Sequence, residues 1–526
     1  MAPKINTDIA ALIIVVLLGA MYYYVALGTP LVFGDEDFYA SQSRAIVQSG
    51  MLPAFDNFHS TDIFHIMSVR PPIYTLISTA GYALLGEFGI KLLIPLFTML
   101  SGLIVYMLLK RMGKPGAGLA AAFLLMVIPG IVTYGVMNYV ETSLLLFFLL
   151  TVYLSSLSFE KKSMRYAVMT GIAMAFAVLT DTTGIFAPAI LLFFFIMIAA
   201  KSKFDKDILK LFGVMIIVGL VLVAPFFARQ MALWGSLCYP PFINVNDCEA
   251  VRDIAIPHSE SLKFDAAVAP TGVGLPIITF GLLNYASFAF GIPLLVLVCL
   301  GAAMLFARKD NMSRMLMVWF VLFLIITVGT ALMVRSDGST VRSEDAVRFT
   351  LFGFPVLAVI SGMFFSEIYN RFKKYDYIVF IVVAMALFAS FFFGLQKLEG
   401  MDQIKSGSYQ GLMAACDWVR ANAPADSIIY ATYAHQTAWL CDRSAKTTVP
   451  DKAEIALTNN DTSYEHLKMH GYDYVLIEAF TVSNSRYEEG NTGDFVNYLL
   501  TSDKFKKVYD NTNVYGQNGI LIFQVL

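Results

Sequence analysis

Residues 9–40 read IAALIIVVLLGAMYYYVALGTPLVFGDEDFYA. Up to Gly34 this stretch carries no charged side chain, and an apolar helix of that length can cross the hydrocarbon core of a bilayer. Asp35, Glu36 and Asp37 follow directly. Carboxylates at a membrane interface are costly to desolvate and repel one another, so one of them is suited to act as a general base. The alternative is that the acids only begin the next helix, where the helix dipole favours them.

The composition describes a protein with many membrane spans. Of the 526 residues, 57% are hydrophobic and only 14% are charged, which favours a membrane protein over a soluble one. The net charge of −2, without a basic run, gives no indication of a nucleic-acid partner. No small-residue cleavage pattern closes the first apolar segment, because Pro30 and the acids follow it. We therefore expect a retained helix and not a cleaved signal peptide.

Twelve segments are free or nearly free of charge, and the basic residues between them predict which ones cross the membrane. The segments are 9–28, 71–86, 92–109, 117–134, 142–158, 166–180, 184–200, 211–228, 276–306, 315–334, 349–366 and 378–396. Lysines and arginines cluster at 110–114, 161–165, 201–210, 308–314 and 371–374. The positive-inside rule places all these clusters in the cytoplasm. They can share one side only if one segment before residue 109 does not cross.

The segment 71–86 is the one that we expect not to cross. Its helix would be about 24 Å long, shorter than the roughly 30 Å hydrocarbon core. It opens with Pro71-Pro72, and only residues 87–89 separate it from the next span. The sequence thus predicts a polytopic all-α membrane protein with about eleven transmembrane helices and outer juxtamembrane helices. We also expect the N-terminus to be cytoplasmic and the protein to lie in the plasma membrane.

The remaining polar segments then lie on the outer face. We predict a transmembrane domain over 1–396, with outer loops 29–90 and 229–275, and an extracytoplasmic α/β domain over 397–526. In the outer domain the patterns predict helices at 412–421 and 464–470 and strands at 427–432, 472–477 and 519–525.

Four cysteines share this oxidising side in two pairs. Cys238 and Cys248 lie in one outer loop, and Cys416 and Cys441 lie in the outer domain. Each pair is a candidate disulfide, although spacing alone leaves free thiols open.

Several charges on the outer face have no topological role. Glu141 opens a span without a basic neighbour, which makes it a functional candidate. Asp181 lies in a tight outer turn, where it either serves the site or caps a helix. Arg70, Arg229 and Arg348 lie at the outer interface. Such arginines either bind a lipid phosphate bidentately or snorkel to headgroups.

The acid cluster also permits a divalent metal ion. Asp35 and Asp37 have suitable spacing, but no histidine joins them, so the need for a metal stays open.

Several short motifs resemble the glycosyltransferase C superfamily, most closely the lipid A aminoarabinose transferases and the protein O-mannosyltransferases. Asp35-Glu36-Asp37-Phe38-Tyr39-Ala40 is similar to the family's first-loop motif, and Arg70-Pro71-Pro72-Ile73-Tyr74 is similar to its Lys/His-Pro-Pro-Leu motif. Further similar segments are 136–143 with Glu141, 179–188 with Asp181, 225–241, and 348–355 with Arg348. Asp181 stands where many relatives have a basic residue. The Trp-Trp-Asp-Tyr-Gly motif of oligosaccharyltransferases is absent.

The resemblance implies inverting transfer of a monosaccharide from a dolichyl or undecaprenyl phosphate to a protein, lipid or glycan acceptor outside the cytoplasm. Asp35 would be the general base, and Glu36 and Glu141 would position acceptor or sugar. Arg70, Arg229 and Arg348 would bind the donor phosphate. Asp37, Tyr39 and Asp181 are further site candidates.

Two other classes of protein remain as alternatives. One is a flippase or transporter of lipid-linked sugars, which the one-sided interfacial charges disfavour. The other is a membrane protein that binds glycans without catalysis. The sequence does not identify the sugar, the acceptor or the length of the carrier lipid.

Overall fold

The computed structural model describes residues 6–31, 36–50, 71–203, 205–234, 292–307, 311–331, 348, 350–371, 376–407, 409–431, 434–446, 461–478 and 498–526. Asp35, Arg70, Cys238 and Cys248 lie outside the described residues, so the predictions made for them stay predictions.

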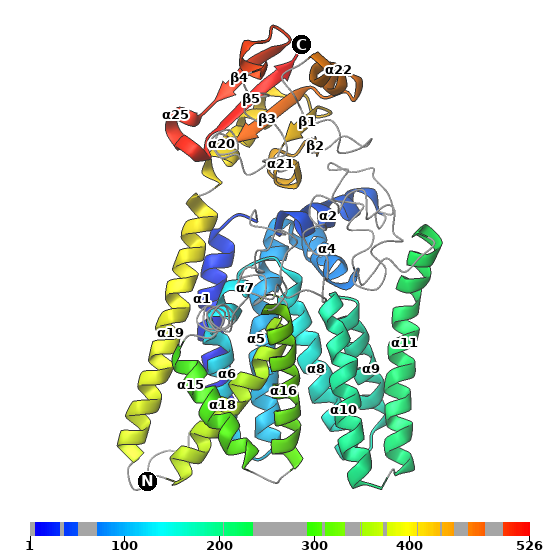
Figure 1. The fold of residues 1–526 in the computed structure, drawn as a ribbon, viewed down its shortest axis with the longest axis vertical. Coiled ribbons are helices and arrows are strands. Elements are labelled where there is room, and N and C mark those ends of the chain that lie inside the picture. The colour runs from blue at the N-terminus through cyan, green and yellow to red at the C-terminus, as the bar shows by residue number, and fades with distance from the viewer. Residues whose placement is uncertain are drawn as a thin grey trace, which may run out of the picture.

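A bundle of apolar helices makes up most of the chain (Figure 1). Its elements are α1 (Thr7–Gly28), α2 (Glu36–Ser49), α4 (Ile73–Leu85), α5 (Glu87–Arg111), α6 (Pro115–Val127), α7 (Pro129–Tyr134), α8 (Val140–Lys161), α9 (Met164–Val178), η1 (Thr182–Ile185), α10 (Phe186–Lys201), α11 (Lys206–Trp234), α15 (Ile292–Phe306), α16 (Asn311–Ala331), η3 (Leu351–Gly353), α18 (Phe354–Arg371) and α19 (Asp376–Gly407). Each of the twelve predicted apolar segments overlaps one of these helices. Among the described residues, six helices are long and apolar enough to span a bilayer, and further apolar helices are shorter. The chain is a multi-pass membrane protein.

The predicted segment 117–134 is not one straight helix. It divides into α6 and α7 around Ile128, and Pro129 is the first residue of α7. Proline has no N–H to continue the hydrogen bonds of a preceding helix but suits the first position of a new one, so the break follows from the sequence.

Ion pairs tie several helices together at one end of the bundle. Lys110 at the end of α5 lies 2.5 Å from Asp8 of α1, and Lys162 after α8 lies 2.6 Å from Asp205 before α11. Arg111 and Glu160 make a further pair at 2.7 Å. Figure 1 shows the N-terminus at this end, and the C-terminus lies at the opposite end of the molecule.

The two short helices α2 and α4 lie at the other end of the bundle, on the side of the C-terminal sheet (Figure 1). The Thr75 hydroxyl of α4 donates to Gln42 Oε1 of α2 at 2.7 Å. Between α4 and α5 stands only Gly86, with φ +64°, so the separation is shorter than the predicted 87–89. A Cβ at Gly89 would lie 2.0 Å from the Gly81 carbonyl oxygen, so no side chain fits where these two helices cross.

The C-terminal domain, here called the sheet domain, packs helices on both faces of a mixed five-stranded sheet. Its elements are α20 (Gln410–Asn422), β1 (Ile428–Ala431), α21 (Ala434–Cys441), β2 (Ser444–Lys446), α22 (Asp461–Met469), β3 (Tyr474–Glu478), β4 (Phe505–Asp510), α25 (Thr512–Tyr515), η5 (Gly516–Asn518) and β5 (Ile520–Val525). The strand order is β2-β1-β3-β5-β4, in which β1 is parallel to β2 and β3, and β5 is antiparallel to β3 and β4.

Successive side chains of β3 pack on opposite faces of this sheet. Leu476 packs in the core beneath α20 and α21, whereas Val475 and Ile477 pack in the core beneath α22. This is the alternation that a strand imposes. The candidate pair Cys416 and Cys441, which the sequence left open, forms a disulfide that joins α20 to α21.

The helix α19 leads from the bundle to the sheet domain (Figure 1). Its residues run on to Gly407, past the predicted domain boundary at 396/397, which stays a prediction.

Candidate active site

A buried polar contact joins the start of α2 to the start of α8. Glu36, the first residue of α2, is fully buried, and so is Asn138. The Asn138 backbone N–H donates to Glu36 Oε1 at 2.9 Å, and its side-chain amide donates to the Glu36 carbonyl oxygen at 2.8 Å. The hydroxyl of Tyr74, in α4, donates to Asn138 Oδ1 at 2.5 Å. Asn138 therefore fixes the first turn of α2 against both α8 and α4.

A largely buried ion pair joins Glu141, three residues after Asn138, to Arg348. Arg348 Nε donates to Glu141 Oε1, and the side chains are 18% and 5% exposed. The Arg348 guanidinium also lies over the ring of Tyr139, 4.5 Å from its centroid, as a cation–π contact. Glu141 Oε2 is buried and has no hydrogen-bond partner among the described residues. One carboxylate oxygen at this position is thus available to a polar group of a bound molecule.

Two tyrosines, Tyr39 and Tyr74, lie near Glu36 and Glu141. The rings of Tyr39 and Tyr74 meet edge to face at 4.9 Å between centroids. Burial raises the pKa of Tyr74 well above 10, and the neighbouring Tyr39, Glu141 and Glu36 act in the same direction. Tyr74 therefore stays a neutral hydrogen-bond donor, and both carboxylates lie within electrostatic reach of it.

Three further predicted site residues, Asp37, Asp181 and Arg229, lie in the described part of the chain at this same end of the bundle. Asp37 is fully buried in the first turn of α2. Asp181 accepts the Thr183 backbone N–H at 2.9 Å and its hydroxyl at 2.7 Å, so it caps η1. Arg229 is half-buried in the last turns of α11.

The structure thus brings Glu36, Tyr39, Glu141 and Arg348 together through Asn138, Tyr74 and Tyr139. Sequence analysis did not single out these last three as site residues. Asn138 could have been selected from the sequence, because a polar amide side chain among apolar residues at the start of a span indicates a functional position. Among the described residues, no group of three or more histidine, cysteine, aspartate or glutamate side chains is arranged to hold a metal ion.

Residues 69–228 match the family described as dolichyl-phosphate-mannose-protein mannosyltransferase. The matched segment is shorter than half of the chain and contains Asn138, Glu141 and Asp181. Over this segment the chain is similar to membrane glycosyltransferases of the glycosyltransferase C superfamily. Enzymes of this type take their sugar from a polyprenyl phosphate. The predicted resemblance is confirmed.

Solved structures share the fold of this glycosyltransferase along most of its length. ArnT from Cupriavidus metallidurans, bound to undecaprenyl phosphate, has 12% identity and a TM-score of 0.65, and the match covers 97% of both chains. The archaeal oligosaccharyltransferase AglB from Archaeoglobus fulgidus, in complex with an inhibitory peptide and a dolichol-phosphate, has 14% identity and a TM-score of 0.62. That match covers 93% of this chain and 72% of AglB. At these identities the likeness concerns the fold alone. A comparison with curated protein sequences finds no match.

Proposed function

We propose that this glycosyltransferase moves a monosaccharide, with inversion, from a polyprenyl phosphate to an acceptor on the extracytoplasmic side. One observation carries the proposal. Two buried acids, Glu36 and Glu141, and the largely buried Arg348 come from separate parts of the chain and lie at one end of an apolar bundle. Buried charges at the end of membrane helices mark functional sites.

The placement of this end outside the cytoplasm rests on charge. The basic residues Lys110, Arg111 and Lys162 lie at the opposite end, where the positive-inside rule expects cytoplasm. The short helix α4 supports a topology of eleven spans in which this helix stays on the outer surface. The sheet domain then lies outside as well.

The reaction needs a base on the acceptor and positive charge on the leaving group. Asp35 directly precedes α2 in the chain and is the proposed base. It takes the proton of the acceptor hydroxyl, whose oxygen forms a bond to the anomeric carbon from the face opposite the phosphate. The bond between this carbon and the phosphate oxygen breaks, and its electron pair stays on the phosphate. Donor-binding arginines stabilise that charge in a site from which water is excluded.

Arg348 is the arginine for which the described contacts give the most detailed role. It is paired with Glu141 through Nε. A guanidinium carries further N–H donors in a planar fork, so it can hold a carboxylate on one edge and a phosphate on another. Glu141 would keep Arg348 in place before the donor arrives and would then position acceptor or sugar through Oε2. Arg70 and Arg229 are the further candidates for phosphate binding.

Asp35→Asn tests the proposal. Glycan profiling of a deletion strain first identifies the missing sugar and its acceptor. The purified protein is then placed in lipid vesicles and supplied with dolichyl-phosphate mannose or undecaprenyl-phosphate aminoarabinose. Turnover should fall by about 10²–10⁴-fold, the usual contribution of general-base catalysis. Asp207→Asn, an exposed acid at the other end of the bundle, is the matched control and should keep full turnover. Full turnover of Asp35→Asn contradicts the proposal.

A further inference from the structure

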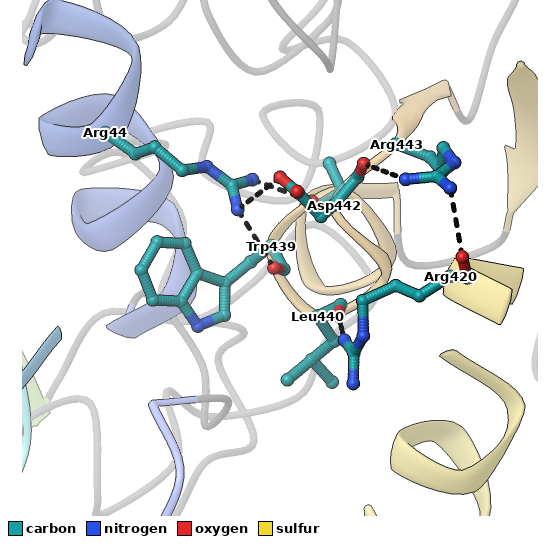
Figure 2. Close-up of polar contacts among 7 residues, drawn as sticks. Arg44, Arg420, Trp439, Leu440, Asp442 and Arg443 are labelled. Atoms are coloured by element: carbon teal, nitrogen blue, oxygen red, sulfur yellow. Dashed lines mark hydrogen bonds and ion pairs between the residues drawn. The ribbon is translucent and has the colours of Figure 1, made fainter. Parts of the chain in front are cut away.

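One arginine of α2 connects the transmembrane part to the sheet domain. Arg44 is 8% exposed and donates to the carbonyl oxygens of Ala438 at 2.8 Å and Trp439 at 3.3 Å. It also forms an ion pair with Asp442 at 3.1 Å, and its guanidinium lies 4.8 Å from the centroid of the Trp439 ring. Figure 2 shows Arg44 reaching from α2 to the end of α21, with Trp439 below it and Asp442 facing it. We call this set of interactions the docking contact.

Apolar side chains surround the docking contact. The Trp439 ring is 7% exposed and belongs to a cluster with Leu31, Ala40 and Ile90 from the bundle. Tyr82 of α4 meets the same ring edge to face at 6.2 Å. Because hydrogen bonds are screened less away from water, the two bonds from Arg44 to the carbonyl oxygens are stronger here than on an open surface. The Asp442 side chain is 59% exposed, so its ion pair with Arg44 is screened more.

The sheet domain holds its own side of the docking contact rigidly. Cys441, the last residue of α21, is bonded to Cys416 of α20. Arg443 donates to the carbonyl oxygens of Asp442 at 2.8 Å and Arg420 at 3.4 Å (Figure 2). It also donates to the carbonyl oxygen of Ala423 at 2.9 Å. The segment that receives Arg44 is therefore fixed to the body of the sheet domain by a covalent bond and by backbone contacts.

The docking contact and the candidate active site are built on opposite ends of the same short helix. Glu36, Ala40 and Arg44 are spaced four residues apart, so they lie along one side of α2. Ala40 and Arg44 contact Trp439, whereas Glu36 contacts Asn138. Arg44 lies eight residues beyond Glu36, which is about 12 Å along the helix axis. Fixing the second half of so short a helix therefore fixes its start.

We propose that the sheet domain is a positioning element of the enzyme, and that Arg44 is a positioning residue. By fixing the second half of α2 against α21, Arg44 holds the acids at the start of this helix where the reaction needs them. The inference rests on the proposed function, because it assumes that the start of α2 takes part in transfer.

Arg44→Met tests the inference in the full-length protein, since methionine keeps an apolar stem and removes the guanidinium. Two readouts are compared. Hydrogen exchange of the amides in 36–49 should become faster, whereas exchange in 140–161 should not change. With dolichyl-phosphate mannose or undecaprenyl-phosphate aminoarabinose in vesicles, kcat should fall by about 10²-fold, which is what a displacement of ~1 Å costs. KM for the donor should stay the same, because Arg348 belongs to the bundle.

Arg371→Met is the matched control, because Arg371 pairs with Glu367 on the exposed surface of α18. It should leave both readouts unchanged. Asp442→Asn should give a smaller change of the same kind as Arg44→Met, and the double variant should be no worse than Arg44→Met alone.

Three results would count against these ideas in different ways. Unchanged exchange in 36–49 overturns the anchoring role of Arg44. Faster exchange with an unchanged kcat overturns the positioning role. Absence of transfer by the unaltered protein with every donor would instead overturn the proposed function, and the exchange measurement would still decide whether α21 anchors α2.

Discussion

Arg348 and Glu141, which are 207 residues apart in the chain, form a buried ion pair over the face of Tyr139. The pair joins the start of α8 to the segment before η3, and Asn138 links that same start of α8 to α2. Two distant parts of the chain are therefore held at one end of the bundle by charges that an apolar environment makes expensive to separate.

Loss of one partner of this pair should destabilise the protein strongly. Arg348→Met leaves the Glu141 carboxylate buried without its cation, which costs about 3–5 kcal/mol of unfolding free energy. The double variant Glu141→Gln/Arg348→Met removes both charges and should recover much of that loss. Thermal unfolding in detergent measures both. Arg371→Met breaks an exposed pair and should cost less than about 1 kcal/mol. A loss in Arg348→Met as small as in this control would show that the buried pair does not stabilise the site.

Replacement of Asn138 should loosen the first turn of α2. Asn138→Ala removes the amide that holds the Glu36 carbonyl and the acceptor of the Tyr74 hydroxyl. Unsatisfied buried polar groups cost about 1–3 kcal/mol each, so the variant should unfold at a lower temperature and lose transferase activity. Asn422→Ala, whose exposed amide donates to the Trp418 carbonyl, is the matched control. Equal stability and activity in the two variants would contradict the role given to Asn138.

Removal of the disulfide should destabilise the sheet domain. Cys416 and Cys441 are separated by 25 residues, and closing a loop of this size stabilises a fold by about 3 kcal/mol. Cys416→Ala/Cys441→Ala should therefore unfold earlier when tryptophan fluorescence is followed. Cys299→Ala, which alters an exposed free cysteine, should change stability by no more than about 0.5 kcal/mol. If Cys416 and Cys441 react with an alkylating reagent in the unreduced, unfolded protein, the disulfide does not form in the cell.

The two ends of the bundle should face opposite sides of the membrane. Lys162→Cys introduces a thiol at the basic end, and Asn422→Cys introduces one in the sheet domain. In intact cells a membrane-impermeant thiol reagent should label the second variant above the background of the unaltered protein and label the first only after permeabilisation. The opposite result would reverse the proposed orientation.

The sequence predicted the elements whose signals are local. Charge-free length predicted the apolar helices of the bundle but not α2, and alternation predicted β1, β3 and β5 of the sheet domain. It did not predict β2, which has only three residues, or β4, an edge strand whose Lys506 and Lys507 interrupt the apolar pattern. Charged residues on an edge strand keep it from pairing with other molecules. They also remove the alternating apolar pattern by which a strand is predicted from sequence.

The site was predictable only in part for a related reason. An isolated acid or arginine at the end of a span is visible in the sequence, and Glu141 and Arg348 were both selected in this way. Their pairing with each other is a property of tertiary packing, which no local pattern encodes. The same holds for Arg44, whose partners lie about 395 residues away.

The burial of Trp439 makes the two parts of the chain dependent on each other to keep apolar surface covered. If the sheet domain were released by a protease, the indole and the neighbouring Leu440 would face water, and Leu31, Ala40 and Ile90 would be uncovered on the bundle. Exposed apolar patches of this kind promote aggregation and recognition by chaperones. A cleaved enzyme should therefore be cleared from the cell rather than persist as a membrane-bound bundle and a separate sheet domain.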